Sequence, residues 1–114
     1  MTLAEFETVV GEALDSLPER FSQYLENLSV VVEEEPTAED LGEAGDHEEL
    51  VGIYRGIPIT ERRYHEPILP DEIVIFRGPV NRIANTRREA IEEIRETVIH
   101  EVGHLFGLDE EELP

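Results

Sequence analysis

The chain has 114 residues, of which 39% are hydrophobic, and this fits one small domain over residues 1–114. Its 28 acidic and 9 basic residues give a net charge of −19, which repels nucleic-acid phosphates and anionic lipids, so we expect neither nucleic acid nor a membrane as a partner. Cysteine chemistry is excluded because there are no cysteines, and without a signal-peptide pattern or an apolar run of about 20 residues we expect a cytoplasmic protein.

Two helices are predicted at the N-terminal end. Apolar residues recur at helical spacing over residues 3–16, which indicates an amphipathic helix. Ser16 and Glu19 have the spacing of a capping pair, which predicts a second, short helix reaching about Leu25.

Three strands follow, separated by two irregular segments. Runs of β-branched and apolar residues predict strands at residues 29–35, 50–54 and 71–77. Residues 36–49 are acidic, contain two glycines and lack an apolar period, so we expect a loop. Residues 55–70 contain three prolines and are expected to form an irregular connection.

The C-terminal part of the chain is predicted to be helical. Pro79 is placed to begin a short helical turn after the third strand. Thr86 and Glu89 have the spacing of a capping box, which predicts a long helix from there to about Phe106. Gly107 is the expected stop, because glycine tolerates the left-handed conformation that ends many helices. This order of elements predicts an α+β fold.

The long helix carries the motif H-E-x-x-H at residues 100–104. Side chains four residues apart lie one above the other on a helix, so His100 and His104 can bind one tetrahedral metal ion. Glu101 lies between them in the sequence, where it can accept a proton from a water molecule at the metal. The motif therefore predicts one zinc ion per chain.

A catalytic zinc site needs a third protein ligand, and two carboxylates after Gly107 are candidates. Glu110 stands ten residues after His100, where the extended motif H-E-x-x-H-x-x-G-x-x-H places its third ligand. We therefore expect Glu110 to be the ligand. Asp109, one position earlier, is the alternative.

The angular position of the two histidines around the helix indicates whether they bind a metal or pack in the core. At about 100° per residue, His100 and His104 lie roughly 160° and 120° from the apolar stripe of the helix, whereas core histidines would lie on it. The alternative is an ordinary pair of exposed histidines. The predicted stripe consists of Arg87, Ile91, Ile94, Val98, Val102 and Leu105.

The chain resembles the minimal bacterial zincin-like metallopeptidases. The resemblance is carried by LPERFSQYLENLSVVVEEEP, GIYRGIPITER, LPDEIVIFRGP and RETVIHEVGHLFGLDEEEL, which together cover most of the chain. It implies two N-terminal helices and a sheet of three or four strands packed on the long helix, with an edge strand beside the cleft. It also implies zinc ligation by His100 and His104, Glu101 as catalytic base, and Glu110 at an acidic position after the glycine.

The resemblance implies hydrolysis of a peptide or protein substrate. Stabilising the oxyanion would need a further donor, for which Tyr54, Arg62, Tyr64 and His65 are candidates. The methionine turn of the larger metzincins is missing, because the only methionine is Met1. The oligomeric state is not indicated.

Two other functions are compatible with the motif. One is a zinc-containing peptide-binding or regulatory module that has weak catalytic activity or none. The other is a metal-dependent endoribonuclease, since the order H-x-x-x-H-x-x-G-x-D resembles such a family. That family generally has glycine where Glu101 stands, and the charge of −19 opposes RNA binding.

Overall fold

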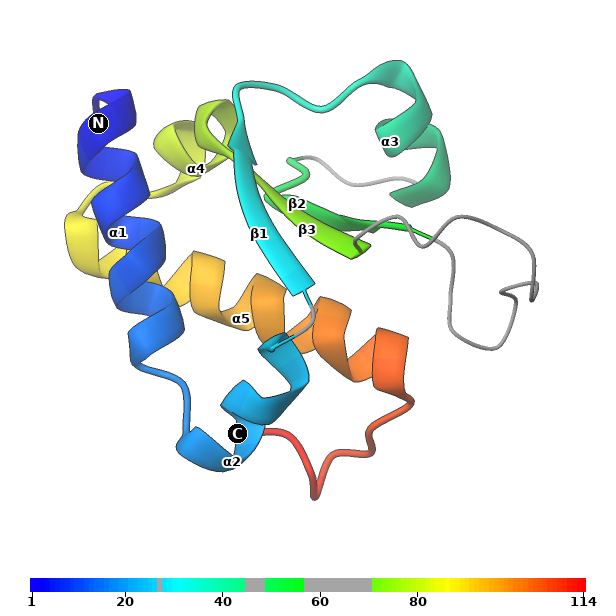
Figure 1. The fold of residues 1–114 in the computed structure, drawn as a ribbon. Helices are drawn as coiled ribbons and strands as arrows, with labels where there is room; N and C mark the ends of the chain where they lie inside the picture. The colour runs from blue at the N-terminus through cyan, green and yellow to red at the C-terminus, as the bar shows by residue number, and fades with distance from the viewer. Residues whose placement is uncertain (27, 45–48, 57–70) are drawn as a thin grey trace.

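The computed structural model describes residues 1–26, 28–44, 49–56 and 71–114. It has an α+β arrangement in which helices lie on both sides of a small sheet (Figure 1). In chain order the elements are α1 (Leu3–Asp15), α2 (Glu19–Ser22), the 3₁₀ turn η1 (Gln23–Leu25), β1 (Leu28–Glu33), α3 (Ala38–Ala44), β2 (Gly52–Arg55), β3 (Asp71–Phe76), α4 (Arg77–Ile83) and α5 (Arg87–Phe106).

The sheet has three strands in the order β1-β3-β2. The central strand, β3, pairs with β1 in parallel, in the register Val30↔Ile73, and with β2 antiparallel, in the register Ile53↔Val74. Residues 73–76 of β3 are fully buried, because both faces of the central strand are covered. The run of apolar residues that predicted this strand is therefore explained by burial on both sides.

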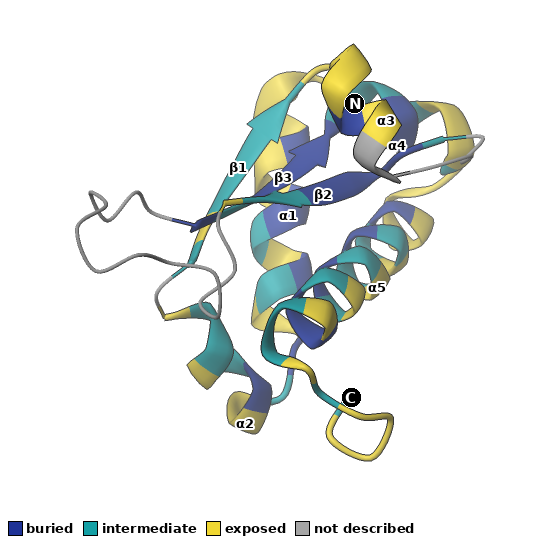
Figure 2. Cartoon of the chain, turned by 90° about the vertical axis from the view of Figure 1, so that its right-hand side faces the viewer, coloured by how far each residue is buried: buried dark blue, intermediate teal, exposed yellow. Residues whose placement is uncertain are grey.

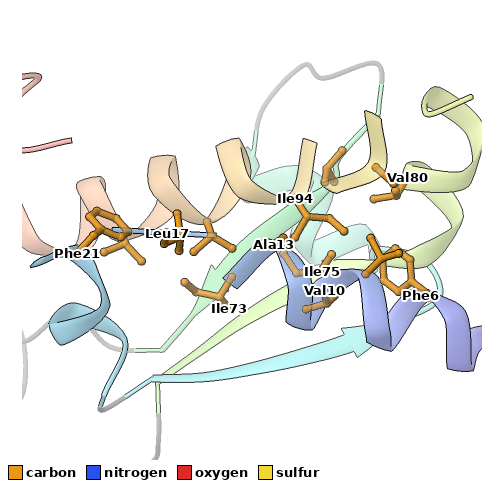
Figure 3. Close-up of a cluster of buried hydrophobic side chains, with 14 residues drawn as sticks. Phe6, Val10, Ala13, Leu17, Phe21, Ile73, Ile75, Val80 and Ile94 are labelled. Atoms are coloured by element: carbon orange, nitrogen blue, oxygen red, sulfur yellow. The ribbon is translucent and has the colours of Figure 1, made fainter. Parts of the chain in front are cut away.

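The main core lies between the sheet and helices α1 and α5. Ile73 and Ile75 point from β3 into this core, and Phe6, Ala13 and Ile94 meet them from the two helices (Figure 3). The alternate β3 residues point to the opposite face of the sheet, as the two-residue period of a strand requires. There they form a second, smaller cluster, which consists of Val74, Phe76, Leu50 and Ile53.

Helix α5 begins and ends at the predicted residues. Thr86 is the N-cap, and its hydroxyl oxygen accepts from the backbone N–H of Glu89 at 3.1 Å, as in a capping box. The carboxylate of Glu89 in turn accepts from the backbone N–H of Asn85 at 2.8 Å. Gly107 ends the helix with φ 63° and ψ 36°, in the left-handed region. The sequence signals for this helix are confirmed.

Residues 38–44 form helix α3, so the prediction of a loop over residues 36–49 was wrong there. Thr37 and Asp40 form a reciprocal cap: the Asp40 N–H donates to the Thr37 hydroxyl at 3.1 Å, and the Thr37 N–H donates to the Asp40 carboxylate at 2.9 Å. These bonds satisfy backbone N–H groups at the start of α3. The prediction relied on apolar periodicity, which does not detect a cap of this kind. Residues 45–48 lie outside the described part of the chain.

Three smaller expectations are also corrected. Ser16 does not cap the second helix, because Pro18 is its N-cap and the Ser16 hydroxyl donates to the Ala13 carbonyl. Helix α4 begins at Arg77, so Pro79 is its third residue, a position where the missing N–H costs nothing. The strands are shifted by one or two residues at their ends, the range over which strand and helix ends are commonly assigned differently.

The buried side of α5 is rotated relative to the predicted stripe. Arg87 is exposed, and Ile91 and Leu105 are only half-buried. The reason is that neighbours on two sides cover the helix, with α1 and the sheet along most of its length and the C-terminal segment near its end. The buried residues are Ala90, Ile94, Val98, Val102 and Gly103. None of the helices in the described part of the chain has the length and apolar character needed to span a bilayer.

Candidate metal centre

His100 and His104 lie on the exposed side of α5, away from its buried residues. Their ring centroids are 4.3 Å apart and the ring planes are inclined by 54°. The two imidazoles therefore stand next to each other on adjacent helical turns, at the surface. This placement fits two nitrogen ligands to one metal ion, and it excludes a packing role in the core for either histidine.

Glu101 is half-buried, unlike the two histidines that flank it in the motif. A residue one position from His100 is rotated by about 100° around the helix, so Glu101 faces a different and less exposed side of α5 than His100 does. A carboxylate at the margin between the protein and solvent is placed to meet a water molecule that approaches the histidines.

The edge strand β2 lies directly against α5, one helical turn before the motif. A Cβ atom at Gly52 would come within 2.7 Å of the Thr97 Cγ2 atom, so the strand approaches the helix at van der Waals contact. In both views β2 and α5 run in the same general direction (Figures 1 and 2). The strand therefore runs along α5 from Thr97 in the direction of the motif residues.

Tyr54 is the one candidate oxyanion donor inside the described residues, because Arg62, Tyr64 and His65 all lie outside them. Its hydroxyl donates a hydrogen bond to the Asp71 carboxylate at 3.0 Å. Asp71 is buried, with 7% of its surface exposed. The bond joins the end of β2 to the start of β3, which gives Tyr54 a structural role in the sheet.

The segment after α5 turns back onto the helix. The Leu108 N–H donates to the Gly103 carbonyl at 2.9 Å, and the Leu113 side chain covers Gly103, where an added Cβ would lie 3.1 Å from the Leu113 Cδ2 atom. Between these two contacts, Asp109 Oδ1 accepts from the N–H groups of Glu111 and Glu112 at 3.1 and 3.2 Å. The chain therefore forms a closed turn rather than a free tail.

Glu110 lies in this turn with an exposed side chain. Within residues 1–26, 28–44, 49–56 and 71–114, no three His, Asp or Glu side chains come together in an arrangement that could hold a metal ion. The structure thus brings His100 and His104 together but does not place Glu110 or Asp109 beside them. The two imidazoles fit zinc in residue type, and within the described part of the chain no third His, Asp or Glu side chain joins them.

A second polar cluster lies on the opposite face of the sheet, and sequence analysis did not predict it. Arg55 donates to Asp40 at 2.6 Å and to Glu33 at 2.7 Å, and its guanidinium carbon lies 6.0 Å from the centroid of the Phe76 ring. It thereby joins β2, β1 and α3. These side chains border an open hollow whose further lining residues are Thr37, Glu39, Tyr54 and Gly56.

Asp40 is the buried member of this cluster, with 4% of its surface exposed. The hydrogen bonds from Arg55, aided by those from Thr37, lower the pKa of Asp40 from 3.8 to about 2, although burial opposes the shift. The same bonds to Asp40 and Glu33 raise the pKa of Arg55. The T-x-x-D spacing of residues 37–40, a capping signal like that of residues 86–89, could have located the start of α3 and Asp40 in the sequence, but not the partner Arg55.

Comparison with known proteins identifies one family and one fold. A family model described as "Zincin-like metallopeptidase" matches residues 25–114, which include the motif and the whole sheet. Among solved structures, a conserved hypothetical protein from Thermo thermophilus is similar, with a TM-score of 0.58 and 24% identity over 95% of this chain and 100% of that one. This second likeness concerns the fold alone. No curated protein matches the chain.

Proposed function

The chain belongs to the zincin-like metallopeptidase family, and from this we propose that it hydrolyses peptide bonds in a peptide or protein substrate with the help of one zinc ion. His100, His104 and Glu110 would hold the ion. When bound, zinc would acidify a water molecule and polarise the scissile carbonyl. The proposal rests above all on the pair of adjacent, exposed imidazoles at the surface of α5.

Glu101 is proposed as the general base. It is half-buried beside the exposed histidines, so it can take a proton from the attacking water and pass it to the leaving amine. The neighbouring strand β2 lies against α5 at Thr97 and runs in the direction of the motif, where it would flank a bound substrate. A substrate at the histidines would therefore be in reach of Glu101 on one side and open to solvent on the other.

The test combines metal content with peptide cleavage. The parent protein, purified without chelator, is expected to contain about one zinc per chain by elemental mass spectrometry. His104→Ala is expected to lose the metal, whereas Glu101→Gln is expected to keep it and to lose cleavage of an unstructured peptide. A Glu101→Gln protein that cleaves at the parent rate would refute the role of Glu101 as base.

Glu92→Gln is the matched control for the Glu101→Gln variant. Glu92 is an exposed glutamate on the same helix and forms an ion pair with Arg88 at 3.4 Å. It stands eight residues before His100, which is about 12 Å along the helix axis. This variant is expected to keep both zinc and cleavage, so a loss of activity in it would point to a general effect of removing charge from α5.

A zinc-containing peptide-binding module without turnover is the second candidate. The observation that favours it is the position of Glu110, which is exposed and has not joined the histidines. Zinc bound at one ion per chain together with no cleavage in any peptide pool would support this candidate. An endoribonuclease is disfavoured, because the family match is to peptidases and the charge of −19 opposes RNA.

A further inference from the structure

We infer that helix α3 opens by itself while the sheet stays folded, and that the contact between Asp40 and Arg55 is the latch that holds it closed. The latch lies on the face of the sheet opposite α5, and in both views the sheet lies between the two helices (Figures 1 and 2). The inference therefore goes beyond the proposed function and does not depend on a metal ion.

Helix α3 buries very little apolar surface. Among its described side chains, that of Asp40 alone is buried. Leu41 is 44% exposed and belongs to neither apolar cluster. A helix of seven residues is too short to be stable alone and normally depends on an apolar face packed against its neighbours. The position of α3 therefore depends on polar contacts.

The contact with Arg55 attaches α3 to the sheet. Arg55 donates to both carboxylate oxygens of Asp40, from Nε to Oδ1 at 3.0 Å and from Nη2 to Oδ2 at 2.6 Å. The bonds between Asp40 and Thr37 lie within the capped segment itself, so they would move with the helix. The attachment of α3 is therefore concentrated in one carboxylate and one guanidinium.

Arg55 is held on the sheet without the help of Asp40. Its guanidinium also donates twice to the Glu33 carboxylate of β1, at 2.7 and 3.0 Å. It lies over the ring of Phe76 as well, on the central strand. When the contact with Asp40 breaks, these contacts keep Arg55 in place, and α3 is the part that separates.

The chain on both sides of α3 is fixed independently of the latch. Arg82 of α4 donates to Glu35, before the helix, at 2.6 Å and to Glu49, after it, at 2.8 Å. The next residue, Leu50, is buried in the second apolar cluster. Because both flanks are held, α3 can open as a local unit without pulling the strands apart.

Opening of α3 changes the polar hollow on this face of the sheet. Thr37, Glu39 and Asp40 line it from the segment that carries α3, and Tyr54 and Arg55 line it from β2. In the open state the hollow loses the first of these walls. The Arg55 donors that Asp40 occupies are then exposed to solvent.

The test is amide hydrogen exchange in the native state, measured by NMR at several low urea concentrations. The Leu41 N–H donates to the Thr37 carbonyl at 3.1 Å and reports on α3, whereas the Phe76 N–H donates to the Val51 carbonyl at 2.8 Å and reports on the sheet. Leu41 is expected to be protected but to exchange through an opening that depends little on urea. Phe76 is expected to depend steeply on urea, because it exchanges only when the whole fold opens.

Arg55→Met removes the latch from the sheet side and leaves the sequence and cap of α3 intact. It is expected to accelerate exchange at Leu41 about 10–100-fold, as for the loss of a hydrogen bond to a charged group. Arg55→Lys keeps the charge without the two-pronged geometry and should have a smaller effect in the same direction. Arg88→Met is the matched control. The Arg88 side chain is 89% exposed and pairs with Glu92 on α5, so its loss should leave exchange at Leu41 unchanged.

Three results would overturn the inference. Equal urea dependence at Leu41 and Phe76 would show that α3 opens only with the whole fold. Exchange at Leu41 as fast as in an unstructured chain would show that nothing holds α3 closed. Unchanged exchange at Leu41 in Arg55→Met and Arg55→Lys would show that the contact with Asp40 is not the latch. None of these measurements involves zinc or cleavage, so the proposed function stands or fails separately.

Discussion

Gly52 of β2 and Thr97 of α5 lie so close together that a Cβ at residue 52 would be 2.7 Å from the Thr97 Cγ2 atom. The same Cβ would be 2.8 Å from the backbone carbonyl oxygen of Val74 on the neighbouring strand. Glycine is therefore required here by the space between the sheet and the helix. This contact sets the height of the edge strand above the helix that carries the metal motif.

Gly52→Ala is expected to destabilise the protein, because the added methyl group meets backbone as well as side-chain atoms. Overpacking of this kind costs about 1–3 kcal/mol, which urea unfolding would measure. Gly11→Ala is the matched control. Gly11 lies inside α1 and an added Cβ would meet nothing within 4 Å, so alanine should stabilise the helix by about 0.5–1 kcal/mol. Equal stability of Gly52→Ala and the parent would contradict the close contact.

Asp40→Asn is expected to lower stability by an amount that depends on pH. Because the pKa of Asp40 is lowered from 3.8 to about 2, its charge stabilises the fold fully above pH 4, and this contribution is lost as the pH falls toward 2. A shift of this size corresponds to about 2 kcal/mol near neutral pH. Unfolding of parent and variant, measured from pH 7 to pH 2, should show the difference shrinking below pH 4.

Glu39→Gln serves as the control for this pH dependence. Glu39 is the exposed neighbour of Asp40 on the same short helix. Its replacement removes one charge from the same region without removing a partner of Arg55. A stability difference for Asp40→Asn that stayed constant from pH 7 to pH 2, or one that Glu39→Gln reproduced, would show that the bonds between Asp40 and Arg55 are not the cause.

Gly107→Ala is expected to destabilise the end of α5 through backbone strain alone. The residue has φ 63°, and an added Cβ would meet nothing within 4 Å, so only the left-handed conformation opposes a side chain. The cost for alanine is about 1–2 kcal/mol, and asparagine at this position should cost less because it tolerates this conformation better. Thermal unfolding of the two variants would rank them. The opposite order would contradict the strain explanation.

Added zinc is expected to raise the unfolding temperature of the parent. A ligand that binds only the folded state at 100 times its Kd stabilises it by about 2.7 kcal/mol, and a chelator should reverse the effect. His104→Ala should show no such rise. The exposed His100 and His104 make no core contact that would confuse the comparison, because neither belongs to the buried side of α5. A rise of equal size in both proteins would indicate zinc binding elsewhere.

Local signals predicted the parts of the fold that depend on neighbours in the sequence. The capping box at Thr86 and Glu89 and the stop at Gly107 gave the bounds of α5, because caps are formed within a few residues of backbone. The run of apolar, mostly β-branched residues at 73–76 likewise predicted a strand there, because this pattern can be read within a few consecutive residues. The positions of His100 and His104 away from the core followed from helical periodicity alone.

Features that depend on distant residues were missed. The arginine at position 55 gives no local sign that it joins Asp40 and Glu33, which are 15 and 22 residues away. Helix α3 was missed for a different reason, because it has no apolar stripe and only the local capping signal at Thr37 and Asp40 marks it in the sequence. Similarly, the sequence spacing of Glu110 could not show that Asp109 serves the turn, since this depends on how the chain folds back onto Gly103.

The strand order has a consequence for synthesis of the chain. The two edge strands are made first, but they do not pair with each other, and the central strand that joins them begins only at Asp71. A nascent chain that has emerged only as far as β2 therefore lacks the strand with which both edge strands pair. The helix with the histidine motif is made last, so the whole sheet is available before the candidate metal centre exists.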